Sequence, residues 1–354
     1  MKVLFAALGT EVEACTRVRI HQHVPGLRRR GIEATVVPFY PRPPKPSRAA
    51  STLEVARRPA LFRRLAHAAS DLARTLRIAR LARDHDAVVL QRVLLPTALQ
   101  RILARSARRL LFDFDDAIYT THAGAAGPHD AAARFEHMLA LTDAAIVSTP
   151  RLAERAQPHA RRVFVIPSPV DCDRYRPRTE GRATGVTIGW IGRDSTTMYL
   201  TPALPVLAEL RRSHPEVRVV LVGAIEGTGA GFAECPAWSL DTEVEQLARF
   251  DIGIMPLTDD EWARGKGGYK LLQYFACGIP AVASPVGANT DIVTPGETGF
   301  LASSTSEWSD ALECLVRDPA LCDRMGMAAR RTAERDHSLA KWTPRLADAL
   351  EEVV

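Results

Sequence analysis

The sequence predicts an α/β protein with two doubly wound domains. Short apolar runs alternate with longer helical patterns along the chain, and this alternation occurs in two series separated by a break. Successive parallel strands need a crossover between them, usually a helix, so the alternation indicates right-handed βαβ units whose sheets are covered on both faces. The length of 354 residues fits two domains of ordinary size.

The first series predicts six strands, at 3–8, 34–38, 87–90, 110–114, 144–148 and 163–166. Each is a short apolar run, as expected of a strand that is buried on both faces. Helical periodicity between the strands predicts helices at 17–30, 61–83 and 133–141.

The second series predicts strands at 186–190, 217–222, 251–255 and 280–283. Helices are predicted at 200–213 and 308–317, and a two-turn helix with a glycine cap is predicted directly before the strand at 280–283. This second series therefore has the same βα character as the first.

Proline and glycine mark the boundary between the two domains. Pro167 and Pro169 end the first series, and residues 174–185, with Pro177 and two glycines, indicate a linker. We therefore expect residues 1–167 to form the first domain and residues 168–337 the second, with a C-terminal helix at about 338–354 that packs back on the first. A second proline-rich stretch, at 38–46, predicts an extended surface loop, which either borders an acceptor cleft or serves as a solvated spacer.

Composition excludes several classes of protein. No run approaches 18 consecutive apolar residues, so no membrane-spanning helix is predicted. Six scattered cysteines without a C-x-x-C pair argue against a disulfide framework and against a zinc site. The apolar N-terminus lacks a small-residue cleavage site and predicts a buried strand, so we expect a cytoplasmic protein. A net charge of +5 favours anionic partners, and cations without interleaved aromatic residues disfavour nucleic acid.

The loops after the strands point to phosphate chemistry of a particular kind. Neither the dinucleotide fingerprint G-x-G-x-x-G nor a Walker A loop occurs, which disfavours dehydrogenases and P-loop kinases. The strand at 186–190 leads instead into a loop that contains Gly192, Arg193, Ser195 and Thr196. Glycine lets the backbone approach a diphosphate, arginine supplies a fork of donors and the hydroxyls cap a helix. A plain βα turn with a serine N-cap explains the same residues equally well.

A second glycine-rich segment carries a cluster of positive charge. Arg264, Lys266 and Lys270 lie at the predicted start of a helix, beside Gly268 and Tyr269. Cations at a helix N-terminus oppose the helix dipole, so we expect an anion to bind there. A solvated basic loop accounts for the charges but not for the neighbouring glycines.

Residues 270–284 resemble the nucleotide-sugar signature of the family 4 (group 1) glycosyltransferases. Four more segments, at 16–37, 112–119, 166–177 and 296–301, resemble stretches of the same family in the same order, one of them from a bacterial branch. The resemblance implies a GT-B fold, with two Rossmann-like domains facing each other across a cleft. It also implies retaining transfer from a nucleoside-diphosphate sugar bound to the second domain, with no cofactor and no obligatory metal.

Two departures from the family pattern concern the donor site. The family's E-x7-E motif falls on Gly265 and Gln273, so both carboxylates are missing. Gln273 can still hydrogen-bond a ribose diol, and an acid at 259, 260 or 261 could replace the first glutamate. The family's diphosphate pair is an Arg and a nearby Lys, for which we expect Arg193 with Lys266 or Lys270. The expected donor-site residues are Gly192, Arg193, Ser195, Thr196, Lys266, Gly268, Tyr269, Lys270 and Gln273.

The first domain holds the expected catalytic and acceptor residues. The segment Asp113-Phe114-Asp115-Asp116 contains a D-x-D pattern at the end of a strand, for which we favour acceptor binding or domain contact over a metal site. Related enzymes place a first-domain histidine near the transferred sugar, which here is His122 or His129. The expected catalytic set is therefore His122, His129 and Asp116, and the acceptor side is Gly9, Thr10, Arg17 and Asp115.

We expect a bacterial hexosyltransferase-type enzyme that uses a small-molecule, glycan or lipid acceptor. A nucleotide-sugar epimerase on the same architecture is the alternative, although such isomerases use carboxylates and the donor cluster is poor in glutamate. A non-catalytic two-lobed sugar-binding protein is a third option. The helix at 61–83 has an apolar stripe, with Arg63, Arg64, Arg74 and Arg77 on its other face. It is either core-packed with a solvated basic face or a peripheral contact with the inner face of a membrane.

Overall fold

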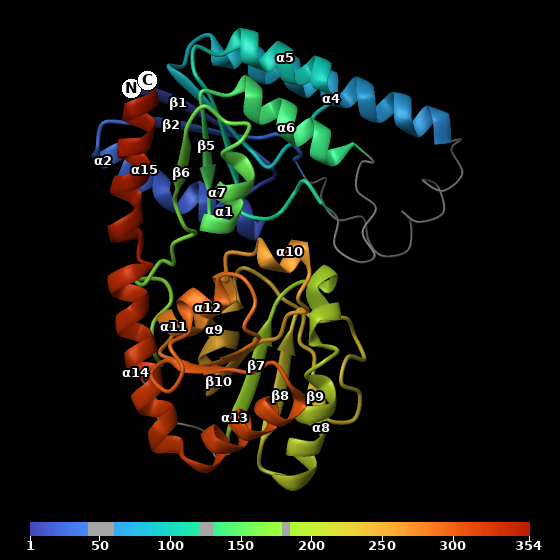
Figure 1. The fold of residues 1–354 in the computed structure, drawn as a ribbon, viewed down its shortest axis with the longest axis vertical. Coiled ribbons are helices and arrows are strands. Elements are labelled where there is room, and N and C mark those ends of the chain that lie inside the picture. Colours follow the sequence, from blue (N-terminus) through green and yellow to red (C-terminus); the bar gives the residue numbers. More distant parts are fainter. Residues whose placement is uncertain (42–59, 121–129, 179–184) are drawn as a thin grey trace. The chain divides into compact units, whose positions relative to one another are not determined.

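The protein folds into two compact units. A computed structural model describes residues 1–41, 60–120, 130–178 and 185–354 (Figure 1). Unit 1 consists of Met1–Pro167 and Thr343–Val354, and unit 2 of Ser168–Trp342. Among the described residues no helix combines the length and the apolar character that a membrane crossing requires.

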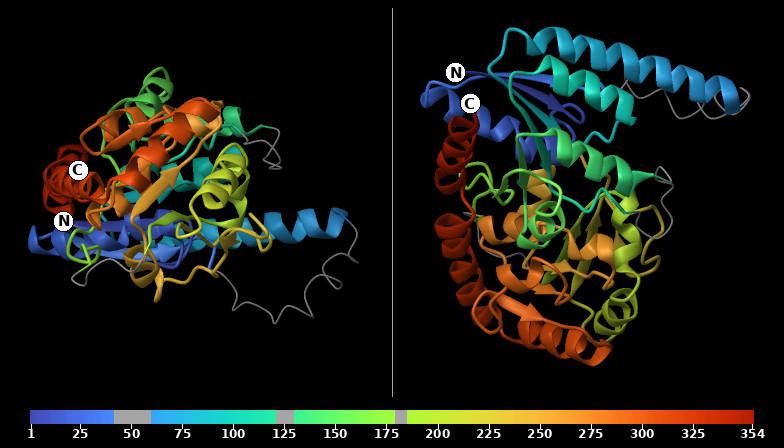
Figure 2. Two further views of the ribbon diagram at one scale, coloured as in Figure 1. Left: turned by 90° about the horizontal axis from the view of Figure 1, so that it is seen from below. Right: turned by 45° about the horizontal axis from the view of Figure 1, so that its top comes forward.

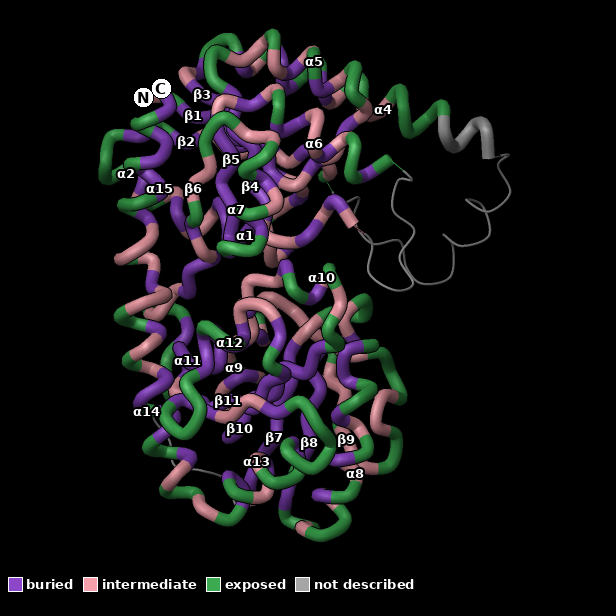
Figure 3. The backbone as a smooth tube through the Cα atoms, viewed as in Figure 1, coloured by how far each residue is buried: buried purple, intermediate pink, exposed green. Residues whose placement is uncertain are grey.

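Unit 1 is built on a parallel sheet with strand order β2-β1-β3-β4-β5-β6 within its described residues. The strands are buried because their residues are largely Val, Leu, Ile, Phe and Ala, which pack against helices on both faces (Figure 3). Their bounds are β1 Lys2–Ala7, β2 Glu33–Pro38, β3 Ala87–Gln91, β4 Leu110–Phe114, β5 Ala144–Val147 and β6 Val163–Val165.

The first predicted helix of unit 1, at 17–30, is divided into three pieces. The backbone leaves helical geometry at Ile20, and a 3₁₀ turn separates two short helices. Pro25 lies in the first turn of the second of these, where its missing N–H is tolerated. The described helices of the unit's first segment are α1 Ala14–Arg19, η1 His21–His23, α2 Val24–Arg29, α4 Ala60–Ala82, α5 Thr97–Ser106, α6 Ala131–Leu141 and α7 Pro150–Ala156.

The last helix, α15 (Leu339–Val353), begins in unit 2, and its residues from Thr343 onward belong to unit 1. The buried His23 ring meets the Thr343 hydroxyl at 2.9 Å, and Arg30 forms an ion pair of 2.9 Å with Asp348. Leu346, Leu350 and Val353 are buried. Both chain ends consequently lie on one side of unit 1 (Figure 2).

Unit 2 contains a second parallel sheet, with strand order β12-β11-β10-β7-β8-β9 within its described residues. Glycines inside two strands make room for aromatic rings: a Cβ on Gly189 would lie 2.1 Å from the Phe250 ring, and one on Gly253 would lie 2.4 Å from the Tyr274 ring. The strands are β7 Thr187–Ile191, β8 Arg218–Val222, β9 Ala233–Glu234, β10 Ile252–Met255, β11 Ala281–Ala283 and β12 Gly299–Leu301.

Helices cover both faces of this second sheet. The described helices are η2 Asp194–Leu200, α8 Leu204–Ser213, α9 Glu243–Ala248, α10 Glu261–Arg264, α11 Tyr269–Ala276, α12 Asn289–Ile292, α13 Thr305–Arg317 and α14 Pro319–Asp336. The two parallel βα sheets confirm the predicted fold class. Every predicted strand is present, while β9 and β12 were not predicted.

Candidate functional site

The expected donor residues gather at the carboxyl edge of the unit 2 sheet. β7 ends at Ile191, and the next strand along the chain, β8, ends at Val222. In a parallel sheet the carboxyl ends of all strands meet at one edge, which is where ligands usually bind. The loop after β7 and the segment before α11 therefore supply the candidate groups.

Two glycines allow the loops after β7 and β8 to touch. The Gly192 amide donates to the Val222 carbonyl at 3.0 Å. A Cβ on Gly192 would lie 2.2 Å from the Trp190 ring, and a Cβ on Gly223, whose φ is +73°, would lie 2.4 Å from the Gly192 carbonyl oxygen. A side chain at Gly223 would force these loops apart, and one at Gly192 would displace the Trp190 ring, so both positions require glycine.

The turn that follows β7 presents Arg193 and Ser195 at the surface. Both side chains are exposed. The Thr196 hydroxyl accepts from the Arg193 amide at 3.1 Å and donates to the Arg193 carbonyl at 2.9 Å. Thr196, whose hydroxyl bonds to Arg193, therefore stabilises the helix start in place of the expected Ser195. The first turn is a 3₁₀ turn. The Thr196 hydroxyl is therefore already hydrogen-bonded within the turn.

Arg264 does not belong to the helix start at which the sequence analysis placed it. It is the last residue of α10, where a cation favours the helix dipole, and it forms bonds of 2.6 and 2.9 Å to Asp259. Asp260 caps α10 by accepting from the Ala263 amide at 2.7 Å. The expectation of three uncompensated cations is therefore wrong for Arg264. Of the three acids proposed as substitutes for the missing glutamate, Asp259 and Asp260 are already engaged.

The two remaining lysines each lie over aromatic rings. The Lys266 ammonium is 5.5 Å from the centre of the Tyr199 ring and 5.8 Å from that of Trp262. The Lys270 ammonium is 5.3 Å from the centre of the Trp190 ring. Such contacts restrain a flexible ammonium through the negative ring face without neutralising its charge. Tyr199 and Trp190 are distant in sequence from the lysines that they contact, whereas Trp262 lies four residues before Lys266.

Gly268 shapes the N-terminus of α11 between these lysines. Its φ is +67°, and a Cβ there would lie 2.5 Å from the Ile292 side chain. Tyr269, the first residue of α11, is half-buried and packs against the unit 2 core. The backbone amides in the first turn of α11 add donors for an anion beside the lysines.

Gln273 faces a buried polar network. Its side-chain nitrogen donates to the Tyr175 hydroxyl at 3.2 Å, and that hydroxyl donates to Glu243 at 2.5 Å. The other carboxylate oxygen of Glu243 accepts from the Trp238 ring nitrogen at 2.9 Å. Tyr175 lies in a segment that the family resemblance included, but no motif in the sequence marks Glu243 or Trp238.

The carboxyl edge of the unit 1 sheet carries the expected acceptor residues. The buried Gln91 side chain accepts from the Leu8 amide at 3.1 Å and fixes the loop after β1. The Gly9 amide donates to Thr16 at 3.3 Å, and the Thr10 carbonyl accepts from the Glu13 amide at 3.0 Å.

Arg17 is turned toward the same loop. It is 6% exposed and donates to the carbonyls of Glu11 and Val12 at 3.3 and 3.4 Å. Arg17 thus supports the loop that contains Gly9 and Thr10.

Arginines engage all three acids of the D-x-D segment. Arg19 pairs with the buried Asp113 at 2.5 Å. Arg92, a non-glycine residue with φ of +57°, forms ion pairs of 2.9 Å with both Asp115 and Asp116. Burial raises the pKa of Asp115, while Arg92 acts in the opposite direction. Within the part of the chain that the structure describes, no group of three acids, histidines or cysteines is arranged for a metal ion.

A family model matches the part of unit 2 that contains these features. Residues 185–318 match the model described as "Glycosyl transferases group 1", and this stretch contains the loops from Gly192 through Gln273. Over this stretch the chain is similar to the group 1 glycosyltransferases.

Curated relatives match the chain over part of their own length. The chain is similar to the GDP-mannose-dependent alpha-(1-6)-phosphatidylinositol monomannoside mannosyltransferase of Mycolicibacterium smegmatis, with 28% identity over 214 residues. That match covers 52% of this chain and 55% of the mannosyltransferase. The chain spans about half the length of the curated relatives it matches.

Solved structures share the fold over nearly the whole chain. Sucrose-phosphate synthase from Thermosynechococcus elongatus gives a TM-score of 0.74 at 13% identity, covering 99% of this chain and 98% of that one. Anabaena Alr3699/HepE in complex with UDP-glucose gives 0.71 at 15% identity, covering 99% and 100%. The likeness confirms the expected GT-B fold.

The expected site residues fall into three groups. The donor residues come together at one edge of unit 2, with Thr196 and Gln273 bonded to protein groups. Gly9, Thr10, Arg17, Asp115 and Asp116 come together at one edge of unit 1, with Asp116 held by Arg92. His122 and His129 lie outside the described residues.

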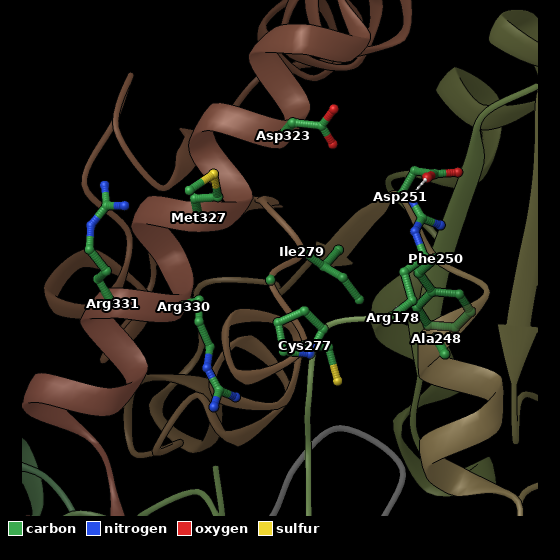
Figure 4. Close-up of a pocket in the computed structure, with 12 residues that line it drawn as sticks. Arg178, Ala248, Phe250, Asp251, Cys277, Ile279, Asp323, Met327, Arg330 and Arg331 are labelled. Carbon is green, nitrogen blue, oxygen red and sulfur yellow. Dashed lines mark hydrogen bonds and ion pairs between the residues drawn. The ribbon is translucent and has the colours of Figure 1, made fainter. Parts of the chain in front are cut away.

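A cavity of about 660 Å³ lies elsewhere in unit 2 (Figure 4). Asp251 and Ile279, which line it, precede β10 and β11, so the cavity is at the amino edge of the sheet. Arg178 and Asp251 form an ion pair of 2.5 Å on one wall, and Met327 and Asp323 of α14 form the other (Figure 4). Its position separates it from the cationic groups of the donor residues.

Proposed function

We propose that this protein transfers a sugar from a nucleoside-diphosphate sugar to an acceptor hydroxyl, with retention of anomeric configuration. The observation that carries the proposal is the placement of Lys266 and Lys270 over aromatic rings at the start of α11. Restrained cations beside the first amides of a helix, at the carboxyl edge of a parallel sheet, suit a diphosphate. The name of the M. smegmatis relative specifies GDP-mannose, and the Anabaena structure contains UDP-glucose, which supports a nucleotide-sugar donor.

The same groups stabilise the charge that develops during the reaction. As the bond between the anomeric carbon and the diphosphate oxygen breaks, negative charge develops on the leaving diphosphate. Arg193, Lys266 and Lys270 stabilise that charge by preorganised electrostatics. The acceptor oxygen attacks the same face of the sugar, and its proton passes to the leaving side. Front-face displacement of this kind retains the anomeric configuration.

We assign donor binding to unit 2 and acceptor binding to unit 1. In unit 1, Gly9, Thr10 and the Arg92-bound carboxylates of Asp115 and Asp116 offer hydrogen-bonding groups to a polar acceptor. Arg17 acts by supporting the Gly9–Thr10 loop. His122 and His129 remain proposed catalytic residues.

The proposed reaction needs neither a metal nor a cofactor. Cationic side chains supply the charge stabilisation that a metal provides in other glycosyltransferases. The acids of the D-x-D segment are paired with Arg19 and Arg92. We therefore expect turnover to be unchanged by a chelator such as EDTA, and a chelator-sensitive activity that Mg²⁺ or Mn²⁺ restores would contradict this part of the proposal.

Binding and product analysis test the activity. Calorimetry with UDP, GDP and their sugar conjugates should reveal micromolar binding of at least one nucleoside diphosphate. Incubation with that donor and a panel of hydroxyl acceptors should give a product whose anomeric configuration, read by NMR, matches the donor. Conversion of the nucleotide sugar without acceptor indicates the epimerase alternative, and binding of none of the nucleotides rejects the proposal.

We also propose that α4 contacts an anionic lipid surface. Leu65, Leu72 and Leu76 are 58%, 41% and 39% exposed, and their spacing of seven and four residues places them on one face. Arg77 and Arg80 are exposed beside that face. Arg74, expected on the basic face, instead lies 5.0 Å over the Tyr40 ring and 3.4 Å from Asp71. Exposed leucines flanked by arginines suit the interface of an anionic bilayer.

Vesicle flotation tests this contact. The protein should float with phosphatidylglycerol vesicles and not with phosphatidylcholine vesicles, since the arginines need anionic headgroups. Leu72→Asp should abolish flotation, whereas Ile225→Asp, at another exposed apolar residue that is in unit 2, should leave it unchanged. Failure of the unaltered protein to float with anionic vesicles rejects the membrane contact and leaves the proposed transfer reaction intact.

A further inference from the structure

A buried chain of hydrogen bonds ends at Gln273, the position at which the family pattern has a glutamate. Gln273 and Glu243 are 4% and 3% exposed, and the Tyr175 hydroxyl lies between them. Arg174 lies 3.9 Å from Glu243, so the carboxylate faces a cation as well as two donors. A glutamate carboxylate offers only acceptors, so the hydrogen bonds from Tyr175 and Trp238 are both donated to Glu243.

The number of protons in this network fixes the orientation of the Gln273 amide. A tyrosine hydroxyl has one proton, and the 2.5 Å bond to the Glu243 carboxylate uses it. Toward Gln273, Tyr175 can offer only a lone pair, so the amide must present its NH₂ group. The carbonyl oxygen of Gln273 then has no hydrogen-bond partner among the described residues and remains an acceptor for a ligand.

A glutamate at position 273 would disturb the same network. Its carboxylate would face the Tyr175 oxygen with no proton available, and two buried carboxylates would compete for one hydroxyl. The presence of Glu243 therefore accounts for glutamine in place of the family's glutamate.

We propose that Glu243, acting through Tyr175, requires glutamine at position 273 and directs its carbonyl oxygen toward the vicinal diol of the donor's ribose. Tyr175 and Glu243 are positioning residues, and Gln273 is the residue that touches the ligand. This inference rests on the proposed function for the identity of the ligand, while the coupling between positions 243 and 273 exists in the free protein.

A double-mutant cycle tests the coupling without any ligand. Gln273→Glu should lower the melting temperature of the full chain, and lowering the pH should reduce the loss because protonation of the new carboxylate supplies the missing donor. Adding Glu243→Gln should restore the melting temperature, since the new amide at position 243 can donate to the Tyr175 hydroxyl while that hydroxyl donates to the new carboxylate at position 273. Additive effects of the two changes would overturn the inference.

Ligand binding tests the second half of the proposal. UDP and GDP are compared with the 2′,3′-dideoxy form of whichever nucleotide binds more tightly. The unaltered protein should prefer the diol-containing nucleotide by about tenfold, or roughly 1.4 kcal/mol. Gln273→Ala should remove this preference, and the matched variant Gln246→Ala, on α9, should keep it.

The outcomes separate this inference from the proposed function. If positions 243 and 273 are coupled but no nucleoside diphosphate binds, the proposed function and the assignment of the diol are rejected. The hydrogen-bond network itself is then still supported. Nucleotide binding with no preference for the diol overturns the role of Gln273 and leaves the proposed function intact. Tyr175→Phe provides a further check, because Gln273→Glu should be less harmful in that background.

Discussion

Lys266 and Lys270 show how single side chains can be charged and yet restrained. Each ammonium lies close to an aromatic ring centre, at 5.5 and 5.8 Å for Lys266 and 5.3 Å for Lys270. Contact with an aromatic ring restrains an ammonium group without changing its formal charge.

We predict that Lys266→Ala weakens binding of a nucleoside diphosphate by about tenfold or more, at least roughly 1.4 kcal/mol, because a charge-assisted bond is lost. Arg193→Ala should have a similar effect. Binding of the phosphate-free nucleoside should barely change. The melting temperature of the free protein should fall slightly for Lys266→Ala, since the ring contacts disappear. Isothermal titration calorimetry provides the measurement.

Arg212→Ala is the control for this prediction, because Arg212 is exposed on α8 and paired with Glu209. Unchanged diphosphate affinity in Lys266→Ala, together with a clear loss of stability, would make Lys266 a structural residue.

His23 gives unit 1 a dependence on pH. Burial, with the positive charge of Arg19, lowers the pKa of His23 to about 3. The folded state therefore binds fewer protons than the unfolded chain between about pH 6.5 and 3, and stability decreases as the pH falls through that range. At pH 5 the loss should approach ~2 kcal/mol.

His23→Gln should reduce this acid sensitivity, while the exposed His67→Gln should not. Urea denaturation at pH 7 and pH 5 measures both. An identical loss in His23→Gln and in the unaltered protein would exclude His23 as the source.

At the residue scale, the sequence indicates local structure where the residue type determines it. Gly192 and Gly268 indicate close backbone approach, and Lys266 and Lys270 indicate positive charge, while their role in donor binding stays a prediction. The partners of Arg264 and Gln273 were not predicted, because Asp259 and Tyr175 reach them through a turn and through tertiary packing. Buried polar pairing leaves no periodic pattern in a sequence.

At the scale of elements, α11 and α14 illustrate close packing through small residues. A Cβ on Gly326 of α14 would lie 2.0 Å from the carbonyl oxygen of Gly278, which follows α11. Backbone contact of this kind fixes the distance between the helix and the turn. α11 also carries Lys270 and Gln273, so the packing of α14 helps to place donor residues.

We predict that Gly326→Ala destabilises unit 2 by about 2–4 kcal/mol, because the added methyl group must displace the helix or the turn. Helix propensity alone predicts the opposite, a gain of about 1 kcal/mol. Urea denaturation of the full chain decides between the two. Met327→Ala, at the adjacent and 64% exposed residue, is the control and should change stability by less than the glycine variant. A stabilised Gly326→Ala variant would contradict the packing argument.

Strands and helices were predictable to different degrees. The buried central strands have apolar runs that cannot be mistaken for loops, and all were predicted. β9 and β12 have only two and three residues, too few for a periodic signal. The helix at 17–30 was predicted as continuous, but Ile20 and Pro25 divide it, since a short apolar stripe does not reveal a local change of backbone.

At the scale of the whole molecule, unit 1 is assembled from two distant segments of chain. Its sheet comes from Met1–Pro167, and Thr343–Val354 supplies buried apolar side chains and the pairs of Arg30 with Asp348 and Glu351. We predict that removing residues 343–354 lowers the unfolding temperature of unit 1 by at least about 10 °C. Two buried leucines and a valine account for roughly 5 kcal/mol or more.

Hydrogen exchange measured by mass spectrometry tests this in each unit separately. Peptides from β1, β3 and β4 should lose protection, and peptides from β7 and β10 should keep it. Equal loss in both units, or unchanged protection in unit 1, would contradict the assignment of residues 343–354.

Because unit 1 is assembled from two separate segments, it cannot be completed during synthesis until the second segment has been made. The strands of unit 1 are synthesised first, but the helix that completes this unit is synthesised only after all of unit 2. At about 5–20 residues per second, the interval between Pro167 and the final turn of α15 lasts on the order of 10–40 s. During that time the surface that later receives Leu346 and Leu350 is exposed. Unit 2 is continuous and can fold as soon as it emerges, so the segment made first should be the last to reach its native state.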